Sequence, residues 1–304
     1  MPSSAPLVLR GQRFDAGRPA VMAIVNRTPD SFFSGNRLAD LDAAKRAVET
    51  DLEAGADIID VGGVRAGQQG EPVGPAEEIK RVVPFLEWAR AAHPEVILSL
   101  DTWRSEVARE AGAVGLDLVN DTWAAADPDL VHVAAALGAG YVVSHTGGLP
   151  PRTDPVDVSY GDDPLDVVRD VITTLGTGAG VAELSGIPRE RILVDPTLDF
   201  GKTTANSLEV LRHTAEVVAL GYPVLQAVSR KDFVGEALDL PAEERLEGSL
   251  AATAVAAWLG AIAFRAHDVR ATRRVLDMVA TIRGDRAPRL ALRGVRRPPA
   301  EKPG

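Results

Sequence analysis

One stretch of the chain contains the unit that is repeated along most of its length: residues 41–63 read LDAAKRAVETDLEAGADIIDVGG. Leu41–Ala54 has the amphipathic pattern of a helix, and Gly55 follows at the point where that helix should stop. Asp57–Val61 is a short apolar run rich in β-branched residues, which is typical of a strand covered on both faces. The stretch therefore predicts a helix that leads into a buried strand of a parallel sheet.

The same alternation occurs eight times. The apolar runs predicted as strands are Val21–Val25, Asp57–Val61, Val96–Leu100, Leu118–Asn120, Tyr141–Ser144, Ile192–Asp195, Val224–Val228 and Ala261–Phe264. Amphipathic segments predicted as helices include Leu41–Ala54, Pro75–Ala92, Pro164–Leu184, Glu243–Leu259 and Ala271–Ile282. Strands that alternate with helices form right-handed βαβ units and a parallel sheet.

Eight such units predict an α/β fold, a (β/α)8 TIM barrel. The alternative is an open, doubly wound sheet, which usually has fewer strands and a glycine-rich phosphate turn after the first strand. Here the residues after the first strand are Asn26-Arg27-Thr28-Pro29-Asp30, without a G-x-G-x-x-G pattern. The closed barrel is therefore favoured.

The length of 304 residues suits one barrel, since such a domain takes about 250 residues. We expect an N-terminal extension over residues 1–18, a barrel domain over residues 19–286, and a flexible C-terminal tail over residues 287–304 that is rich in Arg and Pro.

Composition narrows the class of partner. A net charge of −10 argues against a general nucleic-acid binder, which needs a basic surface. The chain has no cysteine, so it forms no disulfide and no thiolate metal site. Its first residues, Met1–Gly11, lack the pattern of a signal peptide, and no apolar run approaches the roughly 18 residues that span a bilayer. We expect a cytoplasmic protein without membrane or nucleic-acid partners.

Polar and charged residues close or follow almost every predicted strand. They are Asn26, Asp60, Asp101, Asn120, Asp121, His145, Asp195, Ser229, Arg230, Lys231, Arg265 and His267. The working residues of α/β barrels lie at these C-terminal strand ends. Helix N-caps would explain many of the Asp, Asn and Ser residues, but not Arg230, Lys231, Arg265 and His267.

These strand-end residues fall into two groups that suit different parts of a ligand. Asp101, Asn120 and Asp195 can read the edge of a flat nitrogen heterocycle, since a carboxylate accepts two parallel hydrogen bonds from an N–C–N edge. The cationic residues follow the seventh and eighth strands, where barrels often bind phosphate. Ordinary alternatives remain: Lys231 as a solvated loop charge, and His145 as a satisfied core residue.

Motifs that run in order from about residue 21 to residue 270 resemble those of the dihydropteroate synthase family. They are MAIVNRTPDSF at 22–32, AGADIIDVGG at 54–63, LDT at 100–102, VND at 119–121, DPTLDFGK at 195–202, SRK at 229–231 and RAHDV at 265–269. Members of this family join 6-hydroxymethyl-7,8-dihydropterin diphosphate to p-aminobenzoate and release pyrophosphate.

The resemblance implies a role for each matching residue. The pterin would be bound by Asp101, Asn120, Asp195 and Lys231, with Phe200 flanking the ring. The diphosphate would be bound by Asn26, Arg265 and His267, with Mg²⁺ near Asn26, and Ser229 would join the substrate-binding set. Lys231, Arg265 and His267 would be the catalytic residues. The resemblance also implies a homodimer.

The chain departs from the family pattern in the two loops that complete the p-aminobenzoate site. Ser34 replaces an acidic residue in the first loop, and Arg27 replaces a valine before it. In the second loop, Ala66 and Gly67 stand for a threonine and an arginine. After the fourth strand, Thr122-Trp123 replaces a smaller turn. The combination resembles a divergent second copy of the synthase found in some actinobacteria.

Three functions are compatible with these residues. The first is a synthase, or a transferase that passes the same pterin to another acceptor, and the retained cations favour it. The second is a catalytically inactive pterin-binding paralogue, which the altered loops favour. The third is a methyltransferase acting on a folate methyl group, but such enzymes lack the diphosphate cluster.

Overall fold

The eight predicted strands form one closed parallel barrel. A computed structural model of the chain describes residues 3–27, 41–65, 67, 72–153 and 158–293. The barrel strands are β3 (Ala20–Asn26), β4 (Ile58–Gly62), β5 (Ile97–Asp101), β6 (Leu118–Asn120), β7 (Gly140–Ser144), β8 (Ile192–Asp195), β9 (Leu225–Gln226) and β10 (Ala263–Ala266). They pair in the order β8-β7-β6-β5-β4-β3-β10-β9, and a parallel bridge between Val194 and Val224 joins the two ends. The (β/α)8 prediction is confirmed.

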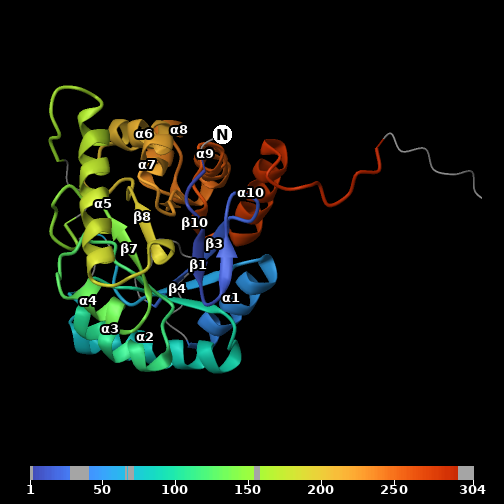
Figure 1. Cartoon of the computed structure of the whole chain (residues 1–304). Coiled ribbons are helices and arrows are strands. Elements are labelled where there is room, and N and C mark those ends of the chain that lie inside the picture. The colour runs from blue at the N-terminus through green and yellow to red at the C-terminus, as the bar shows by residue number, and fades with distance from the viewer. Residues whose placement is uncertain (1–2, 28–40, 66, 68–71, 154–157, 294–304) are drawn as a thin grey trace, which may run out of the picture.

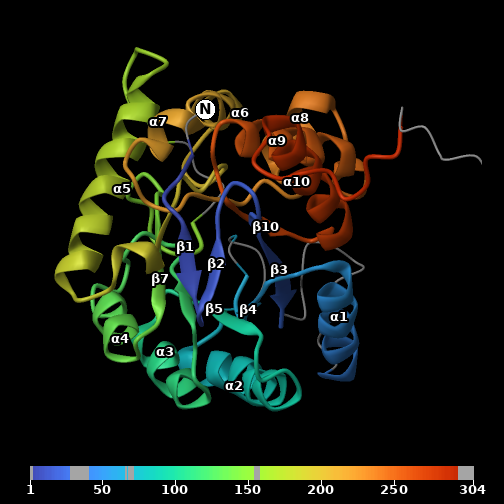
Figure 2. The ribbon, with the colours of Figure 1, turned by 45° about the vertical axis from the view of Figure 1, so that its right-hand side comes forward.

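Helices surround the barrel (Figure 1, Figure 2). They are α1 (Leu41–Ala54), α2 (Pro75–Ala92), α3 (Ser105–Ala111), α4 (Leu130–Ala136), α5 (Asp166–Leu184), α6 (Thr204–Arg212), α7 (Thr214–Val218), α8 (Asp232–Leu238), α9 (Leu246–Trp258) and α10 (Val269–Arg283). Gly55 ends α1 with a φ of 100°, which only glycine adopts without strain. Within the part of the chain that the structure describes, none of the helices has the length and apolar character needed to span a bilayer.

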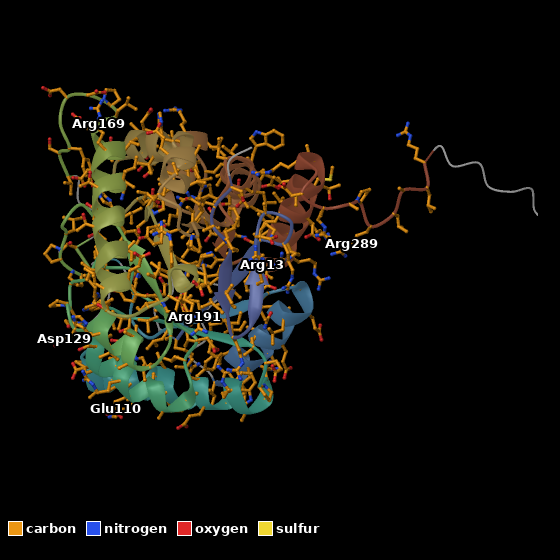
Figure 3. The ribbon with its side chains drawn as sticks, viewed as in Figure 1. Arg13, Glu110, Asp129, Arg169, Arg191 and Arg289 are labelled. Atoms are coloured by element: carbon orange, nitrogen blue, oxygen red, sulfur yellow. The ribbon has the colours of Figure 1, made fainter. Side chains whose placement is uncertain are left out.

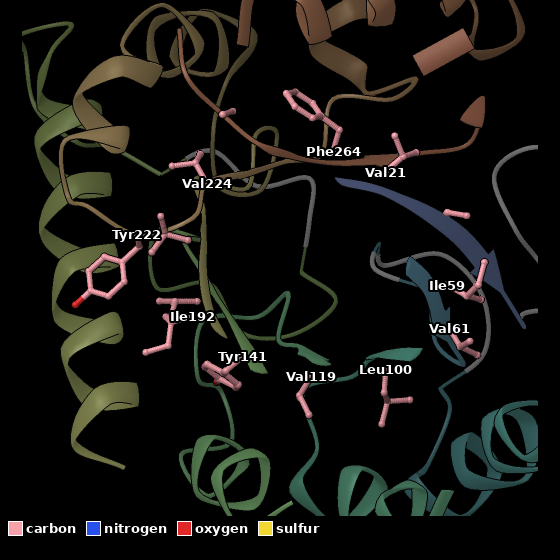
Figure 4. Close-up of a cluster of buried hydrophobic side chains, with 14 of the residues drawn as sticks. Val21, Ile59, Val61, Leu100, Val119, Tyr141, Ile192, Tyr222, Val224 and Phe264 are labelled. Carbon is pink, nitrogen blue, oxygen red and sulfur yellow. The ribbon is translucent and has the colours of Figure 1, made fainter. Parts of the chain in front are cut away.

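Each strand alternates between two apolar environments. One set of strand residues, which includes Val21, Ile59, Leu100 and Phe264, packs with the surrounding helices in a single cluster (Figure 4). The intervening residues form a second buried cluster inside the barrel, which contains Ala20, Met22, Ile58, Ile97, Leu118, Val142, Leu193, Leu225, Ile262 and Ala263. Because the side-chain period of a strand is two, this alternation fixes which residues point inward.

An antiparallel hairpin belongs to the inner cluster. Its strands β1 (Leu7–Leu9) and β2 (Gln12–Phe14) precede the barrel, and Leu7, Leu9 and Phe14 are buried against the inward-facing residues at the start of the barrel strands. Residues 1–18 therefore contribute core side chains. At the other end of the chain, residues 287–293 are exposed, and residues 294–304 of the predicted tail lie outside the described residues.

Candidate functional site

The inward-facing series of the strands changes from apolar to polar toward the C-terminal mouth of the barrel. In β4, Ile58 is followed two residues later by Asp60, and in β6, Leu118 is followed by Asn120. Asn26, Asp101, Asp195 and Arg265 likewise lie two or four residues after an inner-cluster residue of the same strand. The period of two therefore brings six polar side chains from six strands to one end of the barrel.

Arg265 links two carboxylates across this mouth. Its Nε donates to Asp60 Oδ2 at 2.6 Å, and its Nη2 donates to Asp101 Oδ2 at 2.7 Å. Asp60 is fully buried and also accepts hydrogen bonds from Ser99 Oγ at 2.5 Å and Asn120 Nδ2 at 3.0 Å. The sequence placed Asp60 at a strand end without a role. In the structure it orients both Arg265 and Asn120.

Hydrogen-bond acceptors remain available beside this network. Asn120 Nδ2 donates to Asp60, whereas Asn120 Oδ1 is buried and has no hydrogen-bond partner among the described residues. Burial raises the pKa of Asp101 to about 7, although Arg265 opposes the shift. Burial also raises the pKa of Asp195, and Lys231 lowers it in part. An amide oxygen and two desolvated carboxyls suit a ligand that presents several N–H donors.

Phe200 and Lys231 lie together at the wall of the site. Lys231 Nζ lies 4.7 Å from the centre of the Phe200 ring and donates a hydrogen bond to the Leu198 carbonyl. The ring of Phe200 also meets the buried indole of Trp123 edge-on, with 5.2 Å between centroids. Phe200 is thus supported from one side by an indole that is too large for the small turn expected from the family pattern.

His267 and Ser229 form a second group, in the segments that follow β10 and β9. The Ser229 hydroxyl lies 3.1 Å from His267 Nδ1 and accepts from the His267 backbone N–H at 3.2 Å. Burial and the charge of Arg265 lower the pKa of His267 to about 4, so the ring is neutral at pH 7.

Arg230 is set apart from these residues, although the sequence grouped it with the cations of the mouth. Its guanidinium forms two hydrogen bonds to Asp268, at 2.9 and 3.0 Å, and also donates to the carbonyls of Ala242 and Glu243. A bidentate pair of this kind fixes a loop. Arg230 therefore ties the segment after β9 to the start of α10.

Asn26 lies at the end of β3, beside Asp101. Gly62 separates the two residues: an added Cβ there would lie 3.4 Å from Asp101 Oδ2 and 3.6 Å from Asn26 Oδ1. An amide oxygen is a suitable ligand for Mg²⁺, which commonly binds one or two protein oxygens together with phosphate oxygens and water. The described residues contain no group of three His or acidic side chains that would hold a metal without such help. The residues therefore fit an ion that binds together with a diphosphate.

Lys202 is a buried residue whose importance the sequence did not indicate. Its Nζ donates to the carbonyls of His145, Thr197 and Phe200 at 3.0, 3.1 and 3.0 Å, and burial lowers its pKa to about 7. The ammonium thereby fixes the loop that carries Phe200. His145 is fully buried, with Nε2 2.6 Å from Asp170 Oδ1, while its Nδ1 is buried without a hydrogen-bond partner among the described residues, so the ring is a core residue that is only partly satisfied.

The structure describes only some of the residues that depart from the family pattern. The Arg27 guanidinium lies 5.6 Å from the ring of Phe85 on α2, outside the barrel. Gly67 is buried, and its carbonyl accepts a hydrogen bond from Arg152 at 3.3 Å. Ser34 and Ala66 lie outside the described residues. Arg27 therefore does not supply the mouth with a replacement cation.

Comparison with known proteins agrees with this geometry. A family model described as "Pterin binding enzyme" matches residues 22–267, which include every residue of the mouth discussed above and all of the barrel strands except the first two residues of β3. The chain belongs to this pterin binding enzyme family.

Individual members of the family show the range of relationships. The chain is 52% identical over 288 residues to "Inactive dihydropteroate synthase 2" of Mycobacterium leprae, covering 95% of this chain and 99% of the relative. A dihydropteroate synthase of Coxiella burnetii solved with pteroic acid has a TM-score of 0.81 and 32% identity, with coverage of 93% and 100%. The Xanthomonas albilineans synthase solved with 4-aminobenzoic acid has a TM-score of 0.80 and 36% identity, with coverage of 92% and 99%. The chain is thus similar both to synthases and to a relative named inactive.

Proposed function

We propose that the protein binds 6-hydroxymethyl-7,8-dihydropterin diphosphate at the mouth of its barrel and does not carry out the ordinary condensation with p-aminobenzoate. One observation carries the proposal: the unpartnered Asn120 Oδ1 lies in a buried set of acceptors with Asp101 and Asp195, next to Lys231, Arg265 and His267. The similarity to a relative named inactive supports the loss of the ordinary reaction.

In this proposal each half of the ligand has its own residues. The N–H groups of the pterin would donate to Asp101, Asn120 and Asp195, while Phe200 and Lys231 lie along the ring. Because Asp101 is now bound to Arg265, a pterin that hydrogen-bonds Asp101 would free part of the guanidinium for the diphosphate. Exchange of one partner for another avoids leaving a buried charge unpaired.

The diphosphate would be held by Asn26, Arg265 and His267, with Mg²⁺ at the Asn26 amide oxygen. A bound Mg²⁺ would neutralise charge that develops on leaving pyrophosphate. The residues of this chain would contribute fixed donors around the same oxygens. Neutral His267 has one ring N–H to donate, and its Nδ1 contact with Ser229 holds the ring in place.

Two measurements on the purified protein test the proposal. Titration calorimetry should show binding of the pterin diphosphate in the presence of Mg²⁺. A pyrophosphate-release assay with p-aminobenzoate should show no release that depends on p-aminobenzoate. Absence of pterin binding would refute the proposed site, whereas binding followed by p-aminobenzoate-dependent release would identify a working synthase.

A transferase with a different acceptor is the second candidate. It is favoured by the retention of the residues proposed for the diphosphate, Asn26, Arg265 and His267, which a protein that only binds the pterin ring would not need. If this candidate is correct, the release assay should show pyrophosphate when another nucleophilic amine or thiol replaces p-aminobenzoate.

We also propose that the protein is a homodimer that joins through α9 and α10. Four exposed apolar side chains lie on these two helices: Val255 and Trp258 on α9, and Met278 and Ile282 on α10. The helices are in contact, since Arg283 at the end of α10 donates to the Trp258 carbonyl at 2.8 Å. A second copy of the chain would cover this surface. A cytoplasmic location is part of the same proposal, because a charged diphosphate does not cross a bilayer unaided.

A further inference from the structure

A second cationic site lies at the opposite end of the barrel from the mouth. Four arginines and two aspartates from three separate parts of the chain line a cavity of about 360 Å³: Arg18, Asp57, Arg273, Asp277, Arg286 and Arg289. Arg18 precedes β3, Asp57 precedes β4, and the other four residues belong to α10 and the segment after it. The cavity is thus at the N-terminal ends of the strands.

Both carboxylates of this cavity are fully engaged. Arg18 Nη2 lies 2.9 Å from Asp57 Oδ1, while Asp57 Oδ2 accepts from Arg273 and from the Val21 backbone N–H. Asp277 contacts Arg286 with one oxygen and Arg289, at 2.8 Å, with the other. Two carboxylates therefore hold four guanidinium groups close together, and the lining carries an excess of two positive charges.

The surrounding region reinforces this excess. Residues 269–293 contain seven arginines and two aspartates, whereas the whole chain has a net charge of −10. Arg289 lies on the outside of the molecule, next to the end of α10 (Figure 3), and its side chain is 77% exposed. Arg18 is 56% exposed. These two guanidinium groups have donors directed to solvent as well as to their carboxylates, since each guanidinium has five N–H donors.

We propose that this cavity, which we call the arginine cavity, binds the dianionic phosphate group of a small phosphate ester. Guanidinium groups match phosphate oxygens in geometry, and a phosphate monoester carries close to two negative charges at neutral pH. That charge equals the excess of the lining. The volume lies within the range of small-molecule sites, so there is room for the organic part of an ester beside the phosphate. The site does not depend on the function proposed for the mouth.

The test uses titration calorimetry of the full-length protein at constant ionic strength, with glycerol phosphate, inorganic phosphate and acetate as separate probes. We expect saturable binding of both phosphates and none of acetate. Tighter binding of glycerol phosphate than of inorganic phosphate would identify an ester as the ligand, and equal affinity would identify phosphate itself. Absence of saturable binding of either phosphate would overturn the proposal.

Variants assign the binding to the arginine cavity. The double substitution Arg286→Ala/Arg289→Ala leaves the lining with no excess charge, and affinity should fall by about ten-fold or more, as expected from lost charge-assisted hydrogen bonds. Arg270→Ala/Arg274→Ala removes the same charge from exposed positions of α10 outside the cavity and should leave the affinity unchanged. Equal losses in the two double variants would mean a general charge effect and would contradict a defined site.

A third variant separates ligand binding from a purely structural use of these arginines. Asp277→Asn raises the excess charge of the lining, so phosphate affinity should increase several-fold even if the protein becomes less stable. Arginines that serve only to hold α10 in place would give lower stability without that increase. Because Arg265 and His267 at the mouth also bind phosphate groups in our proposal, Arg265→Gln/His267→Gln serves as the background in which only the arginine cavity is counted.

Discussion

At the scale of single residues, His267 is the group whose charge is most clearly set by its surroundings. Burial and the guanidinium groups of Arg265 and Arg230 disfavour its protonated form, and only Asp268 favours it. The pKa is consequently about 4, compared with about 6.5 for an unperturbed histidine. A neutral ring next to a permanent cation binds an anion as a hydrogen-bond donor, without the desolvation of a second charge.

The pH dependence of His267 can be measured directly. In the folded protein its ring should titrate near pH 4 by NMR, identified by loss of the signal in His267→Gln, whereas His213, which pairs with Glu216 and Glu209, should titrate above 6.5. Since the folded pKa lies below the unfolded one, the contribution of His267 to stability is complete above about pH 6.5 and is lost as the pH falls toward 4. Titration of His267 near 6.5 would mean that the ring is solvated.

Asp195 and Lys231 provide a prediction about affinity. Asp195→Ala removes a buried acceptor of the proposed pterin site, and Lys231→Ala removes the cation beside Phe200. Each should weaken binding of the pterin diphosphate by about ten- to 100-fold, the range for hydrogen bonds to charged groups. Calorimetry on the exposed-site controls Asp129→Ala and Lys80→Ala should give the affinity of the unmodified protein. Unchanged affinity in both site variants would refute the assignment.

The candidate residues were predictable where two signals coincided. Asn26, Asp101, Asn120, Asp195 and Arg265 each lie at or next to the end of a strand and each match a family motif, and the structure brings them to one mouth. Lys202 and Arg230 show the limit of this reasoning. Lys202, which donates to three carbonyls, was given no role in the sequence analysis, and Arg230, which binds Asp268, was grouped with the cations of the mouth. The partners of both residues are set only by the tertiary structure.

At the scale of elements, the barrel strands and long helices were predicted closely. Leu41–Ala54 and Pro75–Ala92 have the predicted bounds, and each of the eight predicted apolar runs overlaps a strand. The hairpin β1–β2 was not predicted, because three-residue strands are too short for a periodic signal. Its position could not be predicted either, since the inner cluster that it joins is assembled from eight other segments.

The hairpin should matter for stability. Phe14 is completely buried at the N-terminal end of the barrel, so Phe14→Ala should lower the free energy of unfolding by about 3–5 kcal/mol, the usual cost of truncating a buried phenylalanine. Arg13→Ala, in the same strand but exposed, should change it by less than about 0.5 kcal/mol. Chemical denaturation measures both. Similar small effects would show that the hairpin is not part of the cooperative core.

At the scale of the whole molecule, the two ends of the barrel differ in their balance of acidic and cationic side chains. The mouth holds carboxyls whose pKa is raised by burial together with a few cations, whereas the arginine cavity has more cations than acids. In our proposals, this separation would let an acidic protein bind anions at defined points without becoming a general polyanion binder. The sequence indicated the mouth, because its residues follow strands. It did not indicate the arginine cavity, whose lining comes from three loops and helix ends.

The apolar surface on α9 and α10 leads to a prediction about assembly. The exposed fractions are 48% for Val255, 39% for Trp258, 57% for Met278 and 60% for Ile282, so a second copy that covers them would remove a substantial apolar area from water. Val255→Asp/Met278→Glu places charges in that interface and should shift the protein from dimer to monomer in analytical ultracentrifugation. Leu184→Glu, on α5, is the matched control, because Leu184 is 91% exposed outside the proposed interface. A dimer that survives the double substitution would have to form through another face, and a monomeric unmodified protein would refute the assembly while leaving the proposed pterin site unaffected, since every residue of that site comes from one chain.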